Sequence, residues 1–366
     1  MDTNRPHSRG RLTGLRAGRG PQDGFSLIEL MVAMTLSLLL LAGVLALTMN
    51  ASQSQRELER SSRLLDNARY AMALVSAEVE HAGFYGRFDN LAALPGALPD
   101  PCDLDVASLQ DDLPFVVQGY DAPVGNPPPQ GPGADCLSDA DHLDGTDILV
   151  LRRTSSAVTP LAALVAGEAY LQSHTMTRRL DQAVSVQASN EAAFDLFEKD
   201  AITRSPIRKH RVDIYYVSPC KDFAAGQSSC TAAADSGSPI PTLTRLELTA
   251  SGGGLTLNRV PLVEGIQNLQ VDYGIDRNDD GAPDETTPGT SGDAYETAPS
   301  LADWEHVVTL RLNLLTRSIE PSAGHQDAKT YRLGLAGTLG PFNDQFKRRV
   351  FAQVTRLVNR SARRED

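Results

Sequence analysis

The sequence lacks the short motifs that mark many enzyme active sites. It contains no H-E-x-x-H metal motif, no G-x-S-x-G nucleophile turn and no G-x-x-x-x-G-K phosphate loop. The seven His residues are scattered along the chain, and paired acids such as Asp111-Asp112 have no visible base or nucleophile beside them. We therefore expect no catalytic residue and a structural rather than an enzymatic role.

The chain also lacks the positive charge that general binding of nucleic acids requires. Its net charge is -12 at pH 7 and its sequence pI is about 5.1. The first 24 residues carry five Arg and two Asp, a net of +3, which leaves -15 for the rest. Because such an acidic body repels phosphate backbones, we expect no nucleic-acid partner. Basic residues near the C-terminus, from Lys347 to Arg364, are read as a solvated face.

No charged residue occurs between Leu30 and Met49. As a helix, these 20 residues would span roughly 30 Å, the thickness of a bilayer core. Basic residues precede the segment and few follow it closely, which predicts a cytoplasmic N-terminus and an exported body. A secretory signal would have a shorter apolar core and a small-residue cleavage site after it, and no clean site of that kind follows Met49.

Neither Pro nor Gly occurs between Gly43 and Gly83. Within this stretch, mostly apolar residues recur at spacings of three and four, at Leu58, Ser61, Leu65, Ala68, Met72, Val75, Val79 and Ala82. The pattern predicts one helix from Phe25 to about Ala82, with Gly83 as its C-terminal stop. We expect the amphipathic half to pack on the protein's own globular domain rather than in a coiled coil.

The rest of the chain reads as β-rich. Residues 89–145 are rich in Pro, Gly and Asp and are predicted to form long loops, and residues 160–200 are ambiguous. Strands are predicted at 147–151, 212–217, 243–248, 255–262, 269–273, 307–315, 331–335 and 350–358. A helix followed by an antiparallel sheet gives an α+β fold.

The residues GFSLIE, from Gly24 to Glu29, resemble the processing site of type IV prepilins and pseudopilins. The resemblance implies that residues 1–24 are a cytoplasmic leader, removed by a prepilin peptidase that then methylates the new N-terminal Phe25. Glu29 becomes the fifth mature residue and would pair with the N-terminal amine of a neighbouring subunit. Such pairing offsets the cost of burying a lone carboxylate in hydrocarbon. The alternative is an ordinary membrane anchor with an interfacial Glu29.

Further segments resemble PilW-type minor pilins, and they run from the helix end to the C-terminus: residues 67–86, 240–248, 262–276, 304–318 and 348–361. The resemblance implies a pilin-like fold. Residues 25–49 would be the transmembrane and filament-core half of the helix, residues 50–83 its amphipathic half, and residues 84–366 an extracytoplasmic domain with an antiparallel sheet and long loops.

The same resemblance implies a subunit that helps to start or cap a type IV pilus. Its partners would be minor and major pilins through the N-terminal helix, the prepilin peptidase, the inner-membrane assembly machinery and a tip adhesin. It would sit in the inner membrane with a periplasmic body and then move to the pilus. Two alternatives remain: a J-type pseudopilin of type II secretion, and a membrane-anchored, calcium-dependent binding module or adhesin.

Four cysteines, an even number in an exported domain, suggest disulfides. Three pairings are possible, of which Cys102–Cys136 and Cys220–Cys230 close the shortest loops. Zinc is the rival, but no C-x-x-C spacing occurs, and free buried thiols remain a further option.

The segment from Asp276 to Glu285 begins with D-x-N-x-D-G, the front of a calcium loop. The expected Ca²⁺ ligands are oxygens of Asp276, Asn278, Asp280, Ala282 and Asp284. The twelfth loop position is Thr287 instead of Glu, which argues against an EF-hand and leaves a gap that Glu296 could fill. The alternative is a solvated strand connection made of turn-forming residues.

Overall fold

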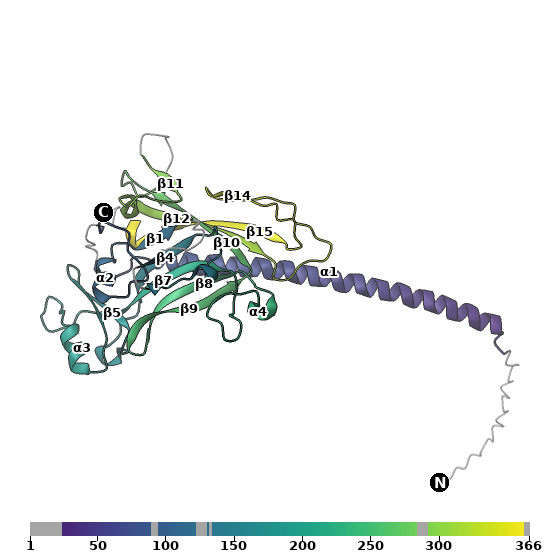
Figure 1. Cartoon of the computed structure of the whole chain (residues 1–366), viewed down its shortest axis with the longest axis horizontal. Coiled ribbons are helices and arrows are strands. Elements are labelled where there is room, and N and C mark those ends of the chain that lie inside the picture. The colour runs from purple at the N-terminus through teal and green to yellow at the C-terminus, as the bar shows by residue number, and fades with distance from the viewer. Residues whose placement is uncertain (1–23, 89–93, 122–129, 132–133, 284–291, 362–366) are drawn as a thin grey trace, which may run out of the picture. The chain divides into compact units, whose positions relative to one another are not determined.

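The fold begins with one long helix, α1 (Leu27–His81), close to the predicted range (Figure 1). The computed structural model describes residues 24–88, 94–121, 130–131, 134–283 and 292–361. The chain divides into two units between residues 56 and 57, so α1 contributes to both. The leader residues 1–23 lie outside the described part of the chain.

Within the second unit, α1 buries one side against the body. Leu64, Ala68, Met72, Val75 and Val79 are all less than 10% exposed. The predicted packing of the helix on its own domain is thus confirmed from Leu64 onward.

The early part of the predicted stripe is wrong, because Leu58 and Ser61 are exposed and Leu64 is buried more deeply than Leu65. Spacings of three and four average 3.5 residues per turn, whereas a straight helix has 3.6, so the stripe drifts round the helix by about 20° per heptad.

The helix ends where the sequence predicts a stop. Gly83 has φ +74°, a left-handed conformation that a side chain disfavours, and its N–H donates to the carbonyl of Arg152 at 2.9 Å. A Cβ at this position would lie 2.9 Å from a methyl group of Val116. The turn therefore fastens the helix end to the first sheet.

The body contains two larger antiparallel sheets, whose strands include every predicted strand except 331–335, which forms part of a separate hairpin. The first sheet has seven strands: β1 (Val117–Tyr120), β4 (Ile148–Thr154), β5 (Ala169–Ser173), β6 (Arg178–Gln182), β7 (Ile207–Ser218), β8 (Thr242–Ser251) and β9 (Gly254–Glu264). The second runs β11-β10-β12-β15, with β10 (Ile266–Ile275), β11 (Ala294–Glu296), β12 (Val307–Arg317) and β15 (Arg348–Arg356).

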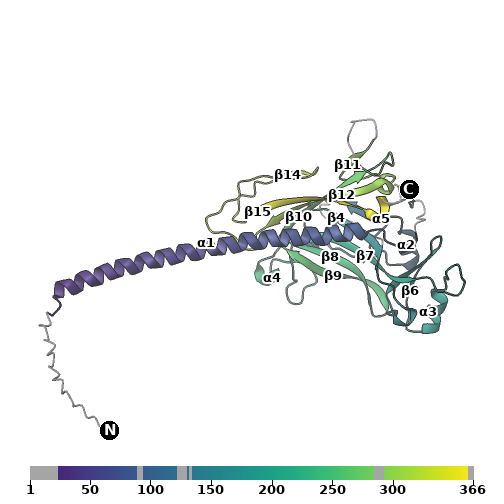
Figure 2. The ribbon, with the colours of Figure 1, turned by 180° about the vertical axis from the view of Figure 1, so that it is seen from behind.

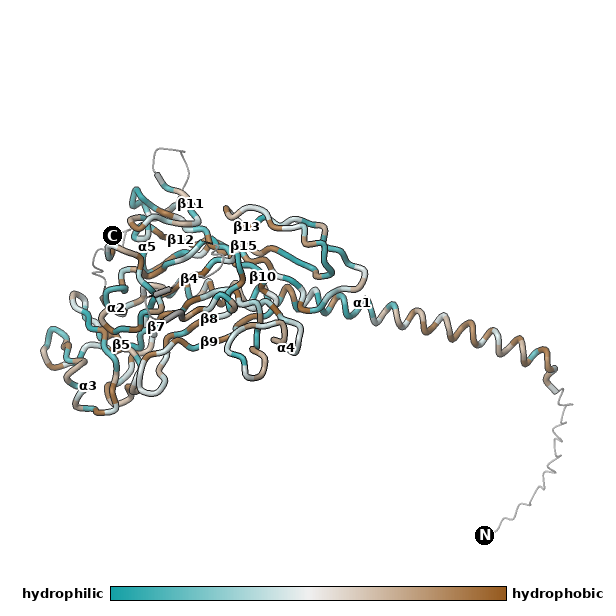
Figure 3. Tube along the Cα trace, viewed as in Figure 1, coloured by the Kyte–Doolittle hydropathy of each residue, from teal (hydrophilic) through white to brown (hydrophobic). Residues whose placement is uncertain are grey.

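Buried polar contacts join the two sheets. Asp147, directly before β4, donates its N–H to the carbonyl of Leu269 at 2.9 Å and accepts the Val271 N–H at 2.7 Å. One core lies between the sheets and the C-terminal half of α1, which passes across strands of both (Figure 2). Figure 3 shows the matching hydropathy: the early part of α1 is coloured mostly as hydrophobic, and its later part is mixed.

Loops are confirmed over residues 94–105, 112–116 and 142–145, whereas the prediction of long loops is wrong for other described residues of 89–145. They contain α2 (Val106–Asp111), β1, β2 (Gln130–Gly131), β3 (Ala134–Asp135) and the short helix η1 (Asp139–Asp141). Asp105 begins α2 by accepting the backbone N–H groups of Ala107 and Ser108. Strand β1 is stabilised by pairing with β4, a contact that local sequence does not reveal.

The ambiguous region from 160 to 200 contains the short helix η2 (Leu161–Ala163), strands β5 and β6, and helix α3 (Gln187–Ala193). The remaining elements are α4 (Ala234–Gly237), η3 (Asp303–His306), the hairpin of β13 (Tyr331–Leu333) and β14 (Gly337–Leu339), and α5 (Val358–Ser361).

Candidate functional site

The residues around the predicted cleavage site form a helix cap. The Ser26 hydroxyl accepts the Ile28 N–H at 3.4 Å, and the Glu29 carboxylate accepts the Ser26 N–H at 3.1 Å. Ser26 lies directly before α1 and Glu29 three residues later, so the two side chains form a capping box in which the hydroxyl accepts the Ile28 N–H instead of the Glu29 N–H. Sequence reasoning missed this second role of Glu29, although the S-x-x-E spacing before an apolar run is its signal.

Gly24 and Phe25 precede the helix, and both are exposed, with Phe25 at 90%. A Cβ added to Gly24 would meet no atom within 4 Å, and its φ lies outside the left-handed region. The protein's own conformation therefore does not require glycine at this position.

The first half of α1 presents apolar side chains on every side. One helix of the described chain is long and apolar enough to cross a membrane, by length and composition, and its most apolar 18-residue window is not buried. Its polar side chains are satisfied locally: Thr35, Ser37 and Thr48 each donate to a carbonyl three or four residues earlier. This segment can therefore lie in hydrocarbon without unpaired hydroxyl groups.

Three carboxylates gather at the end of the β10–β11 hairpin. One oxygen each from Asp276, Asp280 and Asp293 lies within 4.8 Å of the other two, and both Asp276 and Asp293 are buried. Asp293 reaches this position because Ile275 pairs with Ala294, so the residues next to that pair face one another. The sequence analysis missed Asp293, which is 17 positions after Asp276 and precedes a strand of only three residues.

The other predicted calcium ligands have different surroundings. The Asn278 amide donates to Asp280 at 3.0 Å and its oxygen accepts the Asp280 N–H at 2.9 Å, so both of its polar atoms are used within the loop. Ala282 is exposed and its N–H donates to Asp280 at 3.0 Å. Asp284 lies outside the described residues.

Glu296 does not fill the twelfth-position gap, because it accepts from the Arg277 guanidinium at 2.7 Å. Arg277 also binds Asp303 at 2.8 Å, and this hydrogen bond lowers the pKa of the Asp303 carboxyl. The Arg277 side chain therefore holds the outer side of the loop against the end of β11 and the first residue of η3.

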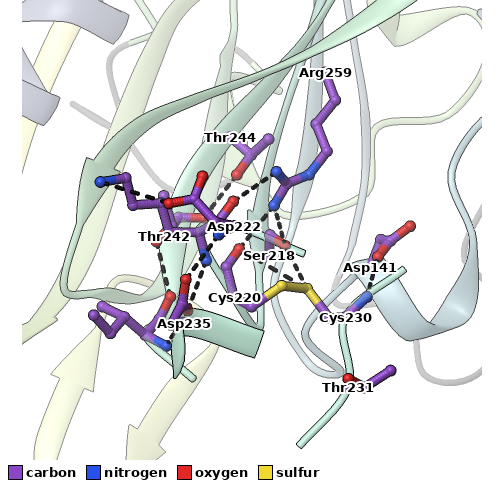
Figure 4. Close-up of a disulfide and its surroundings, with 12 residues drawn as sticks. Asp141, Ser218, Cys220, Asp222, Cys230, Thr231, Asp235, Thr242, Thr244 and Arg259 are labelled. Atoms are coloured by element: carbon purple, nitrogen blue, oxygen red, sulfur yellow. Dashed lines mark hydrogen bonds and ion pairs between the residues drawn. A yellow bond between two sulfur atoms is a disulfide. The ribbon is translucent and has the colours of Figure 1, made fainter. Parts of the chain in front are cut away.

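Two disulfides are present, Cys102–Cys136 and Cys220–Cys230, with Cα–Cα distances of 5.6 and 5.7 Å. The second closes the loop after β7 and is fastened on both sides (Figure 4). Asp141 accepts the Cys230 N–H at 2.8 Å, and Arg259 donates to the Cys220 carbonyl at 2.8 Å. Asp235 accepts N–H groups of Lys221 and Asp222 next to it. Hydrogen bonds from neighbouring segments thus hold the Cys220–Cys230 loop in place.

Two families match this chain. Residues 226–359 match the family described as Type IV Pilus-assembly protein W, and residues 19–45 match the prokaryotic N-terminal methylation motif. The first match covers β8 to β15, including the acidic loop, and the second covers the capping box and much of the apolar half of α1. No curated protein and no solved structure matches the chain.

Proposed function

Taking the chain as a PilW-type pilin, which both family matches support, we propose that it is a minor subunit that helps to start or cap a type IV pilus. The observation that carries the proposal is the position of the methylation motif, which opens a helix whose first half is apolar on every side. Such a surface needs either lipid or the matching helices of other subunits. The role is structural rather than enzymatic.

We propose that a prepilin peptidase cuts between Gly24 and Phe25 and methylates Phe25. Support comes from the exposure of both residues ahead of the helix. It comes also from Gly24, whose missing side chain serves no purpose within this chain. A glycine that its own fold does not need suggests that a different molecule, the peptidase, approaches the backbone closely at this bond.

After cleavage, Glu29 would have two partners. Its Oε2 accepts the Ser26 N–H, while its Oε1 has no hydrogen-bond partner among the described residues. We propose that Oε1 accepts the Phe25 amine of a neighbouring subunit within the filament. A carboxylate held by its own helix cap and by an amine is easier to bury than a lone one.

The protein would be inserted in the inner membrane with its N-terminus in the cytoplasm and its body in the periplasm. From there it would join minor and major pilins, the assembly machinery and a tip adhesin. An apolar helix near the N-terminus and the methylation motif support a membrane-anchored pilin.

We further propose that the acidic loop binds Ca²⁺ through Asp276, Asp280 and Asp293, with Asn278, the Ala282 carbonyl and Asp284 as candidate additional ligands. Three carboxylates that can approach one cation suit a hard divalent ion. Binding would stabilise the folded form by about 2.7 kcal/mol when free calcium is a hundredfold above Kd.

The calcium test is thermal unfolding of the full chain in detergent, once with calcium and once with chelator. A calcium concentration of about 1 mM suits a site of modest affinity. The wild type should melt at a higher temperature with calcium, and Asp293→Asn should lose that difference. Asp195→Asn, which alters an exposed acid on another part of the body, should keep it. Equal melting temperatures of the wild type in both buffers would leave the loop as a solvated turn.

Deletion of the gene tests the main proposal. Cells without the protein should bear few or no surface pili by electron microscopy, and the wild-type gene should restore them. If pili persist while export of type II substrates fails, the chain is a J-type pseudopilin. If pili persist and only calcium-dependent surface binding fails, the chain is an anchored binding module.

A further inference from the structure

Strand β15 forms a long edge of the second sheet without the usual protection against further pairing. It has nine residues, it pairs only with β12 in the sheet order, and its register shows no bulge. Its centre, Val350 to Val354, contains neither charge nor Pro. A long, flat and uncharged edge is a template for another strand.

Other edges among the described strands are protected. Strand β9, the edge of the first sheet, contains Pro261 and a register shift opposite Leu243 and Thr244. Strands β1, β6 and β11 have only four, five and three residues. The open edge of β15 is therefore a local feature of this strand.

The hydrogen bonds at the two ends of β15 show which backbone groups face outward. Ser318 N–H donates to the carbonyl of Lys347, and Leu357 N–H donates to the carbonyl of Val308. The β12–β15 register therefore places Lys347, Leu357 and every second residue between them in one set. The backbone N–H and C=O groups of this set point toward β12. The intervening set points away from β12, and it comprises Val350, Ala352 and Val354.

The outward-facing groups can be reached. Ala352 is exposed and Val354 is 54% exposed, whereas Val350 packs beside Tyr331 and Leu333 of the β13–β14 hairpin. The accessible part of the edge thus begins beside the hairpin and continues toward the C-terminus.

A groove of about 650 Å³ adjoins the beginning of β15. Its walls come from α1, the β13 segment and β15, and they include Leu64, Tyr331 and Val350. It is open to solvent and belongs entirely to the second unit.

The groove carries unpaired positive charge. Lys329, Arg332 and Arg349 line it, all three are exposed, and none has an acidic partner among the described residues. By contrast, Lys347 and Arg348 in the same lining are paired with acids, with Glu57 and with Asp327. Three unpaired cations on a chain of net charge -12 mark a place where an acidic group can be bound.

We propose that an extended, acidic segment of another pilus subunit docks here as a fifth strand on β15. Its backbone pairs with Ala352 and Val354, and its carboxylates meet Arg332 and the neighbouring cations of the groove. This is strand addition, in which backbone hydrogen bonds supply affinity and side chains supply specificity. The proposal rests on the proposed function, because the partner is a subunit of the same filament.

The test is photo-crosslinking in pilus-forming cells, with p-benzoylphenylalanine at Val354 of the full chain. The adduct should map to a segment of another pilin that contains at least two acidic residues. Arg332→Glu should lower the adduct yield about fivefold, because one exposed ion pair is worth up to about 1 kcal/mol. Lys199→Glu, an equal charge change at an exposed lysine outside the groove, should leave the yield unchanged.

A second pair of variants tests the backbone contacts. Ala352→Pro removes an outward N–H without touching the β12 ladder, and should also lower the yield about fivefold. Ala352→Val keeps the N–H and should leave the yield unchanged.

Full yield from both Arg332→Glu and Ala352→Pro would overturn the proposal, as would an adduct only with lipid or with a second copy of this chain. The main function fails separately, if deletion of the gene leaves pili intact. If deletion abolishes pili while Arg332→Glu and Ala352→Pro assemble them normally, only the docking proposal fails.

Discussion

Along α1, the residues before position 57 and those after it differ in what surrounds their apolar side chains. Leu38 and Leu40 in the first half are 65% and 72% exposed, whereas Met72 and Val79 in the second half are 6% and 0% exposed. The second half is also held by ion pairs, such as Glu78 with Arg153 at 2.6 Å. The same helical backbone thus has two surroundings: the apolar side chains of the first half are exposed, and those of the second half pack into the protein's own core.

The largest effect is expected at the start of the first half. Gly24→Ala should leave the fold unchanged, because a Cβ there meets nothing, yet it should abolish leader removal by hindering the peptidase. Mass spectrometry of the membrane fraction should find the wild type beginning at methylated Phe25 and the variant with its leader. Gly43→Ala, at another glycine whose Cβ meets nothing, should be processed normally. A retained leader in the wild type would contradict the processing proposal.

The next effect separates the two roles of Glu29. Glu29→Ala should remain inserted in the membrane but lower assembly more than about tenfold, since a buried charge pair loses one partner. Glu29→Gln keeps the capping interaction with Ser26 and removes only the charge. Pilus yield should therefore fall in both variants. Normal assembly of Glu29→Gln would mean that the cap, and not the charge, is what the filament needs.

Truncating one large apolar side chain to Ala in each half of α1 compares how much each half contributes to the stability of the body. Met72→Ala should lower the unfolding free energy of the body by about 2–5 kcal/mol, because it leaves a cavity beside the sheets. Leu38→Ala should leave that transition unchanged. Trp304, the single tryptophan, is buried in the body and reports its denaturant unfolding by fluorescence. Equal losses in both variants would contradict this comparison.

The smallest expected effect is a change in stability on substitution of Glu57, the first residue of the second unit. Hydrogen bonds from Lys347 and Ser322 lower the pKa of Glu57 from 4.5 to about 2. A lowered pKa in the folded state means that the stabilisation is fully present above pH 4.5 and is lost as pH falls toward 2. Glu57→Gln should cost at most about 1 kcal/mol at pH 7, since the pair is partly exposed. The difference from wild type should narrow below pH 4.5, as Trp304 fluorescence would record; a constant difference down to pH 3 would contradict the assignment.

Much of the fold could be predicted because its signals are local. The absence of Pro and Gly over residues 44–82, the glycine that ends the helix and the alternation in strands such as β12 and β15 are all local patterns that depend on neighbouring residues only. Strands β1, β5 and β6 carry weaker patterns and depend on pairing: β1 with β4, β5 with β7, and β6 with β5. Their stability comes from contacts distant in sequence, so no local window could reveal them.

The candidate sites divide in the same way. The order of Gly24, Phe25 and Glu29 is a property of the sequence, because the proposed cleavage and the helix cap both depend on consecutive residues. The carboxylates of Asp293 and Asp276 lie close together only because β11 pairs with β10 in antiparallel register. Likewise, the open edge of β15 and the cations beside it come from two separate segments, the β13 segment and β15 itself. The sequence by itself therefore determined the methylation motif, the apolar helix and the alternating strands, whereas tertiary structure decided which distant side chains meet, since that depends on strand pairing and helix packing.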